Sequence, residues 1–171
     1  MNLNLGCGTD IKKGWVNCDN AEELPKGVMR VDASYPLPFP DEHFDLVLAS
    51  HVLEHIPNWE GTIEECHRVL KPVGRLIVRV PFGLALEPYH VRSFGLESMS
   101  TFCQDNDGTS LQHPKKRLFR MRSVRTRRSF WFSWHLQHYL GLRFLVGRRW
   151  DFPMGKKVEI IWVLEKPKVN L

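Results

Sequence analysis

The chain has 171 residues and a net charge of +5 at neutral pH. This length fits one domain with a single core, and no apolar run reaches the roughly 18 residues that a membrane-spanning helix needs. The four cysteines lack CxxC spacing, which argues against a zinc cluster or a disulfide framework and favours a reducing cytoplasm. The N-terminal residues lack the basic and hydrophobic stretches of a signal peptide, so we expect a cytoplasmic protein.

The positive charge is concentrated in one region of the sequence. Residues 108–150 contain eleven Lys or Arg and no Asp or Glu, whereas the rest of the chain has thirteen basic and nineteen acidic residues. An anionic partner would therefore meet the protein at this segment.

The first strand-like segment leads directly into a glycine motif. Residues 2–5 alternate and run into Gly6-Cys7-Gly8, where the lack of Cβ atoms lets the backbone turn tightly and approach a ligand. The next apolar segment, 15–18, ends on Asp19, the place where a Rossmann-like sheet hydrogen-bonds ribose hydroxyls. Ile11 replaces the third glycine of a dinucleotide motif, and the acidic residue comes earlier than the usual spacing of about 20 residues, so a simple dinucleotide site is excluded.

The loop between these two strands is unusually short. Six residues separate Gly8 from Trp15, which leaves room for a single helical turn, whereas a parallel crossover usually needs about 10–12 residues or more. We therefore expect the first helix to be nearly absent and one face of the sheet to be thinly covered. A partner subunit, a second copy or the C-terminal segment could cover that face.

The remaining hydrophobic pattern predicts an alternation of strands and helices. Strands are expected at 28–31, 44–49, 75–80, 118–125 and 158–164, and helices at 58–70, 97–103 and 130–146. Seven strands in this order predict an α/β fold: a doubly wound, mostly parallel sheet with helices on both faces and an antiparallel final pair. The strand at 44–49 would deliver Ser50 and His51 to the sheet edge where such folds bind ligands.

Four motifs in order resemble one known family. LNLGCGTD (3–10), GWVNCD (14–19), FDLVLASHVLEHI (44–56) and RVLKPVGRLIVRVP (68–81) resemble small, type 11-like class I S-adenosylmethionine-dependent methyltransferases. The resemblance covers Leu3 to about Met99 and implies a minimal class I methyltransferase fold with S-adenosylmethionine as cofactor and no metal. It divides the single domain, 1–171, into a cofactor-binding part, 1–100, and a basic, aromatic part, 101–171, that completes the sheet.

The resemblance also implies which residues bind the cofactor. The cofactor would lie over the C-terminal ends of strands one, two and four. The implied contacts are Gly6, Cys7 and Gly8 under the methionine end, Asp19 with its neighbour Asn20 at the ribose, Asp32 and Ala33 at the adenine, and Ser50 and His51 near the sulfonium.

His90 is the main candidate for a catalytic residue, and His51 is the second. His90, Arg92 and Phe94 follow the fifth strand and match a His-x-Arg pattern before an aromatic residue that many relatives carry. Positioning alone can lower a methyl-transfer barrier by about 7–11 kcal/mol, and a histidine can also act as a base on an oxygen or nitrogen acceptor. His90 would serve as the base or as a group that orients the acceptor; the alternative is a histidine that braces its loop.

Two other patterns have competing interpretations. The segment His51 to His55 matches the H-x-x-E-H zinc pattern, but Pro57 limits any helix to about one turn, so we expect Glu54 and His55 to orient the loop instead. Cys7 lies between glycines in a cofactor loop, which favours a structural role over a nucleophilic one.

The acceptor and the partners remain open at this stage. We expect a methyltransferase that acts on a small polar metabolite or sugar. The basic segment 115–128 is followed by the aromatic run 130–134, a pattern that suits RNA or an anionic membrane lipid as the alternative target. The same pattern also fits a solvated edge strand whose neighbouring aromatic residues lie in the core. A catalytically silent cofactor-binding subunit that needs a partner is a further alternative.

Overall fold

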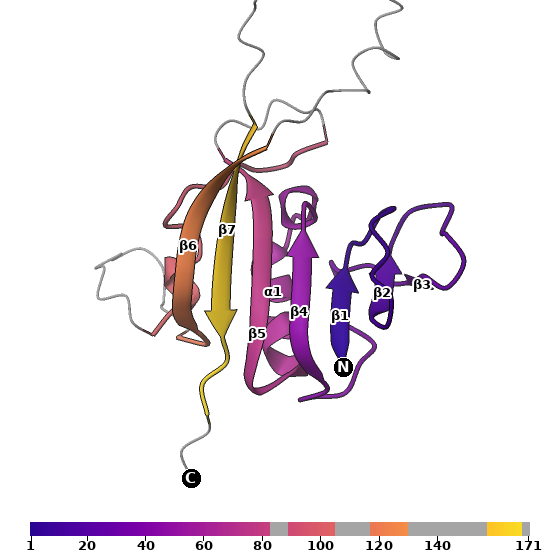
Figure 1. The fold of residues 1–171 in the computed structure, drawn as a ribbon, viewed down its shortest axis with the longest axis horizontal. Helices are drawn as coiled ribbons and strands as arrows, with labels where there is room; N and C mark the ends of the chain where they lie inside the picture. The colour runs from indigo at the N-terminus through magenta and orange to yellow at the C-terminus, as the bar shows by residue number, and fades with distance from the viewer. Residues whose placement is uncertain (83–88, 105–116, 130–156, 169–171) are drawn as a thin grey trace, which may run out of the picture.

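The described residues of the computed structural model, 1–82, 89–104, 117–129 and 157–168, form a single seven-stranded sheet (Figure 1). The strands are β1 (Asn2–Leu5), β2 (Val16–Asp19), β3 (Met29–Arg30), β4 (Phe44–Ser50), β5 (Leu70–Pro81), β6 (Arg120–Ser129) and β7 (Lys157–Glu165). The described helices are α1 (Trp59–Val69) and two short 3₁₀ turns, η1 (Leu53–His55) and η2 (Ser100–Phe102).

The order of the strands across the sheet is β3-β2-β1-β4-β5-β7-β6. The first five strands pair in parallel, whereas β7 runs antiparallel to both β5 and β6. The chain starts in the middle of the sheet, proceeds to one edge and returns through β4 to the other, which is a doubly wound topology. The predicted seven-stranded, mostly parallel sheet with an antiparallel final pair is confirmed.

Two local predictions differ from the structure, and a third falls outside the described residues. Residues 9–14 form turns and no helical turn, and side-chain hydrogen bonds such as the one from the N–H of Lys12 to Asn17 hold the segment instead. The helix expected at 97–103 shrinks to the 3₁₀ turn η2. The helix expected at 130–146 lies outside the described residues.

Helix α1 begins and ends as its sequence indicates. Asn58 is the N-cap, and its side chain accepts a hydrogen bond from the backbone N–H of Gly61 at 3.3 Å. The chain leaves the helix at Leu70 in an extended conformation, as expected shortly before Pro72, which cannot continue a helix. Its buried positions, including Ile63 and Cys66, recur every three to four residues and face the sheet.

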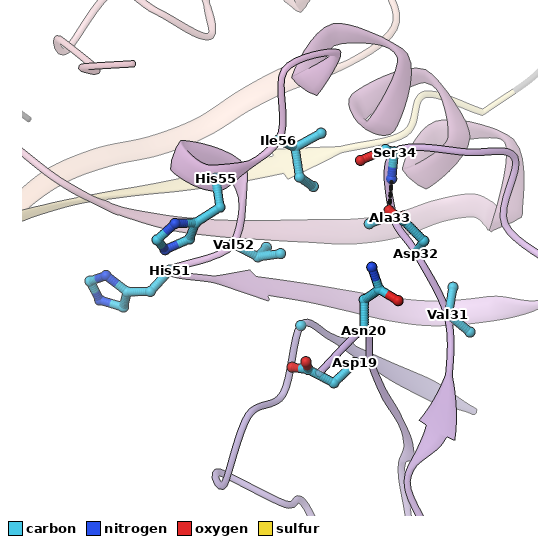
Figure 2. Close-up of a pocket in the computed structure, with 11 residues that line it drawn as sticks. Asp19, Asn20, Val31, Asp32, Ala33, Ser34, His51, Val52, His55 and Ile56 are labelled. Atoms are coloured by element: carbon cyan, nitrogen blue, oxygen red, sulfur yellow. Dashed lines mark hydrogen bonds between the residues drawn. The ribbon is translucent and has the colours of Figure 1, made fainter. Parts of the chain in front are cut away.

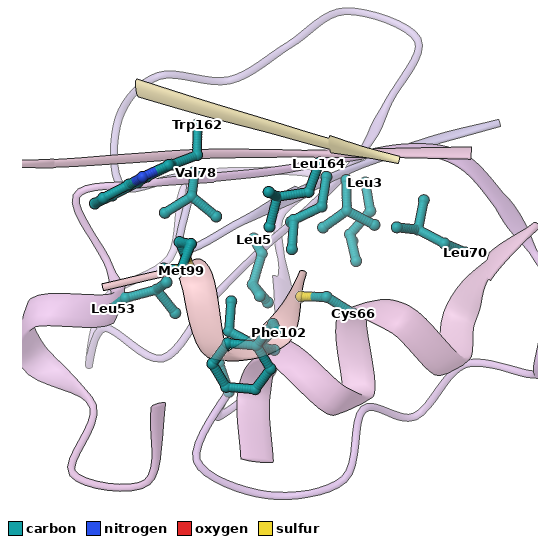
Figure 3. Close-up of a cluster of buried hydrophobic side chains, with 14 of the residues drawn as sticks. Leu3, Leu5, Leu53, Cys66, Leu70, Val78, Met99, Phe102, Trp162 and Leu164 are labelled. Carbon is teal, nitrogen blue, oxygen red and sulfur yellow. The ribbon is translucent and has the colours of Figure 1, made fainter. Parts of the chain in front are cut away.

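The main core lies between α1, η2 and the sheet (Figure 3). Met99, which directly precedes η2, Phe102 from η2, Cys66 from α1 and Trp162 from β7 are all fully or almost fully buried there. The indole N–H of Trp162 donates a 3.0 Å hydrogen bond to the carbonyl of Leu96, so the polar atom of this side chain is satisfied. Among the described residues, no helix is long and apolar enough to span a membrane.

Candidate functional site

The glycine motif forms a tight loop directly after β1. Gly6 and Gly8 have left-handed φ values of 63° and 49°. A Cβ atom on Gly6 would lie 2.5 Å from Cγ2 of Val52, whereas a Cβ atom on Gly8 would meet nothing within 4 Å. Gly6 is therefore required by its close approach to the turn after β4, and Gly8 leaves an open backbone surface that a ligand can approach.

Asp19 links the end of β2 to this loop. One carboxylate oxygen accepts a hydrogen bond from the backbone N–H of Gly8 at 2.7 Å, and the other accepts one from Ala21 at 2.9 Å. Each carboxylate oxygen can accept a second hydrogen bond. Asp19 therefore fixes the glycine loop and keeps acceptor capacity for a ligand hydroxyl.

A cavity of about 330 Å³ opens at the C-terminal ends of the parallel strands, within the size range of small-molecule sites. This is the edge where open α/β sheets bind their ligands. Figure 2 shows the side chains that surround it. The lining residues are Gly6, Asp19, Asn20, Val31, Asp32, Ala33, Ser34, His51, Val52, His55 and Ile56.

The structure brings together most of the residues that the sequence singled out. Of the predicted cofactor contacts, Gly6, Asp19, Asn20, Asp32, Ala33 and His51 line the cavity, and Cys7, Gly8 and Ser50 do not. The sequence analysis missed Val31, Ser34, Val52, His55 and Ile56 as lining residues. All five lie within five positions of a predicted contact. They could have been predicted by including the ends of strands three and four and the turns that follow them.

The turn after β3 is built from hydrogen bonds around Asp32. Its carboxylate accepts a 2.9 Å hydrogen bond from the N–H of Ser34, as in an Asx turn. The carbonyl of Ala33 accepts a 2.8 Å hydrogen bond from the hydroxyl of Thr62, which is buried in α1. Helix α1 therefore holds this wall of the cavity in place.

Cys7 has the environment of a structural residue. It is 5% exposed, and its N–H donates to the carbonyl of Cys18 at 3.0 Å. Burial, followed by the negative charge of Asp19, raises the pKa of the Cys7 thiol. A raised pKa disfavours the thiolate that nucleophilic chemistry needs.

His51 lies at the cavity between two carboxylates. It follows β4 in a left-handed conformation (φ 55°), and its N–H donates to the carbonyl of Arg79 at 2.9 Å. Nδ1 lies 3.3 Å from Oε1 of Glu54, and Nε2 lies 3.2 Å from Oε1 of Glu159 on β7. Glu54 and then Glu159 raise the pKa of His51, and burial partly offsets this. The contact with Glu159 is a hydrogen bond, and the contact with Glu54 becomes an ion pair when the imidazole is protonated.

Glu54, His55 and His90 form a second group beside the cavity. Glu54 is 1% exposed, and neither of its carboxylate oxygens has a hydrogen-bond partner among the described residues. The rings of His55 and His90 meet edge to face, with centroids 4.8 Å apart. His90 itself does not line the cavity, but its contact with His55 places it at the rim.

Sequence comparisons lead to methyltransferases. Residues 3–78, somewhat less than half of the chain, match the family model described as a methyltransferase domain. The chain is 34% identical over 94 residues to the ubiquinone/menaquinone biosynthesis C-methyltransferase UbiE of Paraburkholderia phymatum, which covers 50% of this chain and 38% of that protein. It is 32% identical over 114 residues to the UbiE of Pseudomonas aeruginosa PAO1, which covers 61% of this chain and 44% of that protein. The chain thus spans less than half the length of these curated relatives.

Comparison of structures confirms the fold. An S-adenosylmethionine-dependent methyltransferase from Archaeoglobus fulgidus matches 96% of this chain and 85% of its own, with a TM-score of 0.59 and 17% identity. One from Methanosarcina mazei matches 97% and 92%, with a TM-score of 0.60 and 18% identity. A chain from the complex between the Haloferax volcanii Trm112 methyltransferase activator and a methyltransferase matches 98% and 82%, with a TM-score of 0.61 and 14% identity. The predicted resemblance and the class I fold are confirmed, and the cofactor of this class is S-adenosylmethionine.

Proposed function

We propose that this chain, a relative of the class I S-adenosylmethionine-dependent methyltransferases, binds S-adenosylmethionine in the cavity at the ends of β1, β2 and β4 and transfers its methyl group to an acceptor. One observation carries the proposal: the Gly6 turn and the Asp19 carboxylate meet at a cavity of about 330 Å³ on the ligand-binding edge of the sheet.

The residues of the cavity fit this cofactor. The open side of Gly8 leaves room beside the loop for the methionine end, and the free lone pairs of Asp19 suit ribose hydroxyls. Asp32 and Ala33, with the apolar side chain of Val31, offer a polar and an apolar surface to the adenine. The bound cofactor supplies a methyl group on a sulfonium, and the chain's own task is to hold the acceptor in line with it.

His51 and His90 would act on the acceptor side. His51 borders the cavity and is held by Glu54 and Glu159, which fixes its ring orientation. We assign it the role of a positioning residue. His90 stands at the rim beside His55, where it can contact an acceptor and not the nucleoside.

A small polar acceptor such as a metabolite or a sugar remains our first choice, because the two side chains assigned to the acceptor side, His51 and His90, are imidazoles that can hydrogen-bond to a polar group. An RNA or an anionic lipid is the second, since β6 is an edge strand whose Arg125 and Arg127 side chains are exposed. Exposed arginines also protect an edge strand from pairing with other chains. Retention on immobilised RNA that falls with salt, and that is lost in an Arg125→Gln/Arg127→Gln variant, would favour the second choice.

A partner subunit is also part of the proposal. The described residues contain one α-helix, α1, and 9–14 form turns where a helix commonly covers the sheet. One structurally similar methyltransferase was solved with an activator protein. Mass measurement of the native protein purified from its source would detect a stable complex or a homodimer.

The direct test is the binding of S-adenosylmethionine measured by calorimetry. We expect wild-type protein to bind with one site, and Asp19→Ala to weaken binding at least tenfold, because it removes the ribose acceptor and the clamp on the Gly8 N–H. Asp10→Ala is the matched control in the same loop, since Asp10 is exposed and pairs only with Lys12 among the described ion pairs. Absence of binding by folded wild-type protein would refute the proposal, as would equal affinity of the Asp19 and Asp10 variants.

A further inference from the structure

We infer from the geometry of Glu54, His55 and His90 that the protein binds a divalent transition-metal cation. One potential ligand atom from each residue lies within 4.8 Å of the other two. Glu54 and His55 belong to η1, and His90 comes from the segment that follows β5, so the fold assembles the group from two distant stretches. Two imidazoles and one carboxylate form the donor set of three-ligand zinc and iron sites with open positions.

The state of Glu54 is an independent indication of a cation. The side chain is 1% exposed, and both oxygens lack a hydrogen-bond partner among the described residues. The nearest basic atom is Nδ1 of His51, at 3.3 Å from Oε1. The ion pair with His51 reaches Oε1 alone, and neither oxygen accepts a hydrogen bond of ordinary geometry among the described residues. A buried carboxylate that is only partly compensated is costly, and such a group calls for a further partner. A cation bound to its oxygens would remove that cost.

The neighbouring backbone holds His55 in the form that binds metal. Nδ1 of His55 lies 3.1 Å from the carbonyl oxygen of Tyr89. Because a carbonyl can only accept, Nδ1 carries the proton, and the lone pair of Nε2 is free for a cation. Metal-binding histidines are commonly oriented in this way by a second hydrogen bond.

The segment that carries His90 is tied to η1 as well. The N–H of Val91 donates a 2.9 Å hydrogen bond to the carbonyl of Glu54. Arg92 donates to the carbonyl of Pro57, and its guanidinium lies 5.8 Å from the ring centroid of Trp59. Together with the hydrogen bond between His55 and the carbonyl of Tyr89, these contacts hold the backbone on both sides of His90 beside η1.

Small side-chain rotations would complete the site. Metal–ligand bonds of about 2.0–2.2 Å place two ligand atoms about 3–4 Å apart, so the group must close by about an ångström. His55 is exposed and His90 is half-buried, so both rings can turn toward the fixed Glu54. Three protein ligands leave positions for water or an acceptor oxygen.

The proposed cation site lies next to the cavity, where a bound cation could contact the acceptor. His55 belongs to both the group of three ligands and the cavity lining (Figure 2), so a bound cation would border the cavity and could hold an acceptor oxygen there. This consequence rests on the proposed methyltransferase function, whereas cation binding itself does not. His90 would then act on the acceptor through the cation, and not as a base.

The test is a titration of the full chain with Co²⁺, followed by visible absorption and by calorimetry without S-adenosylmethionine. We expect one equivalent to bind wild-type protein, with the intense bands of low-coordinate Co²⁺. His55→Ala, His90→Ala and Glu54→Gln should each weaken Co²⁺ binding at least tenfold to hundredfold. Loss of a residue that only hydrogen-bonds to a ligand already costs this much, and these three residues would be the ligands themselves. His43→Ala is the matched control: it removes another half-buried imidazole, which packs against Phe44 outside the group, and should leave binding unchanged.

Two results would overturn the inference: no saturable Co²⁺ binding by wild-type protein, or affinities of the His55 and His90 variants equal to that of wild type. Thermal melts verify folding, and the two histidine variants decide the matter if Glu54→Gln does not fold. S-adenosylmethionine binding is measured separately on the same samples. Cobalt binding without cofactor binding would refute the proposed function alone, and the reverse would refute the cation site alone.

Discussion

Replacement of Gly6 by alanine should destabilise the protein by about 3 kcal/mol. The φ of 63° in the left-handed region costs a residue with a Cβ atom about 1–2 kcal/mol. The added Cβ would also lie 2.5 Å from Cγ2 and 2.7 Å from Cβ of Val52, and overpacking of this kind costs about 1–3 kcal/mol. Because Val52 lines the cavity, relief of the overlap would also displace a cavity wall.

The two terms can be separated by matched variants in urea unfolding. Gly8→Ala has the same kind of φ but no neighbour within 4 Å, so it should cost only about 1 kcal/mol. Val52→Ala in the Gly6→Ala background should recover part of the loss, so that the double variant is more stable than the sum of the single changes predicts. Equal costs at Gly6 and Gly8, or strict additivity with Val52→Ala, would refute the assigned close contact.

Two further predictions concern stability. Burial, and then the charge of Lys166, lowers the pKa of His67 to about 4, while the hydrogen bond with the backbone of Leu118 and then Glu42 oppose the shift. The unfolded chain, with a histidine pKa of about 6.5, binds more protons than the folded protein between pH 6.5 and 4, so the free energy of unfolding should fall by up to about 3 kcal/mol as the pH falls across this window. His67→Gln should reduce this fall, measured by urea unfolding at pH 7 and 4.5. An equal fall in the variant and the wild type would contradict the prediction. Arg68 donates to two carboxylates and two backbone carbonyls, so Arg68→Met should lower the free energy of unfolding by about 2 kcal/mol. Lys71→Met, at an exposed ion pair, should lower it by less than about 1 kcal/mol. Equal losses of stability would refute the stabilising role of the Arg68 hydrogen bonds.

The sequence predicted secondary structure best where a hydrophobic pattern is bounded by a glycine or a proline. The strand ending at the glycine motif occupies Asn2–Leu5, as predicted, and the buried run beginning at Phe44 forms β4. The helix before Pro72 was off by one residue at each end. β5 was longer than predicted, because strand pairing with β4 begins at Leu70, before the proline, and resumes after an irregularity. Long-range pairing of this kind leaves no local signal.

The site was less predictable than the fold, because its members meet only through the packing of separate segments. Asp19 was recognisable from its position after a strand, and the structure places it at the cavity. The role of His55 depends on the carbonyl of Tyr89 and on the ring of His90, 35 positions away. The prediction that Pro57 limits any helix at the H-x-x-E-H pattern to about one turn is confirmed, since η1 is a single 3₁₀ turn in which Glu54 is buried.

The short loop after β1 shows how the fold dispenses with a helix there. Asn4 and Asn17 are buried on adjacent strands, and the side-chain amide of Asn4 donates to Asn17 at 3.0 Å and to the carbonyl of Asp10 at 2.8 Å. Asn17 in turn accepts from the N–H of Lys12 at 2.8 Å and donates to its carbonyl at 2.9 Å. These bonds satisfy backbone groups that a helix would satisfy internally. Because the asparagines pin the far end of the loop and Asp19 clamps the N–H of Gly8, the glycine backbone stays exposed to the cavity edge in a fixed conformation. The loop therefore has a fixed geometry that suits the proposed binding of S-adenosylmethionine, although residues 9–14 form no helix.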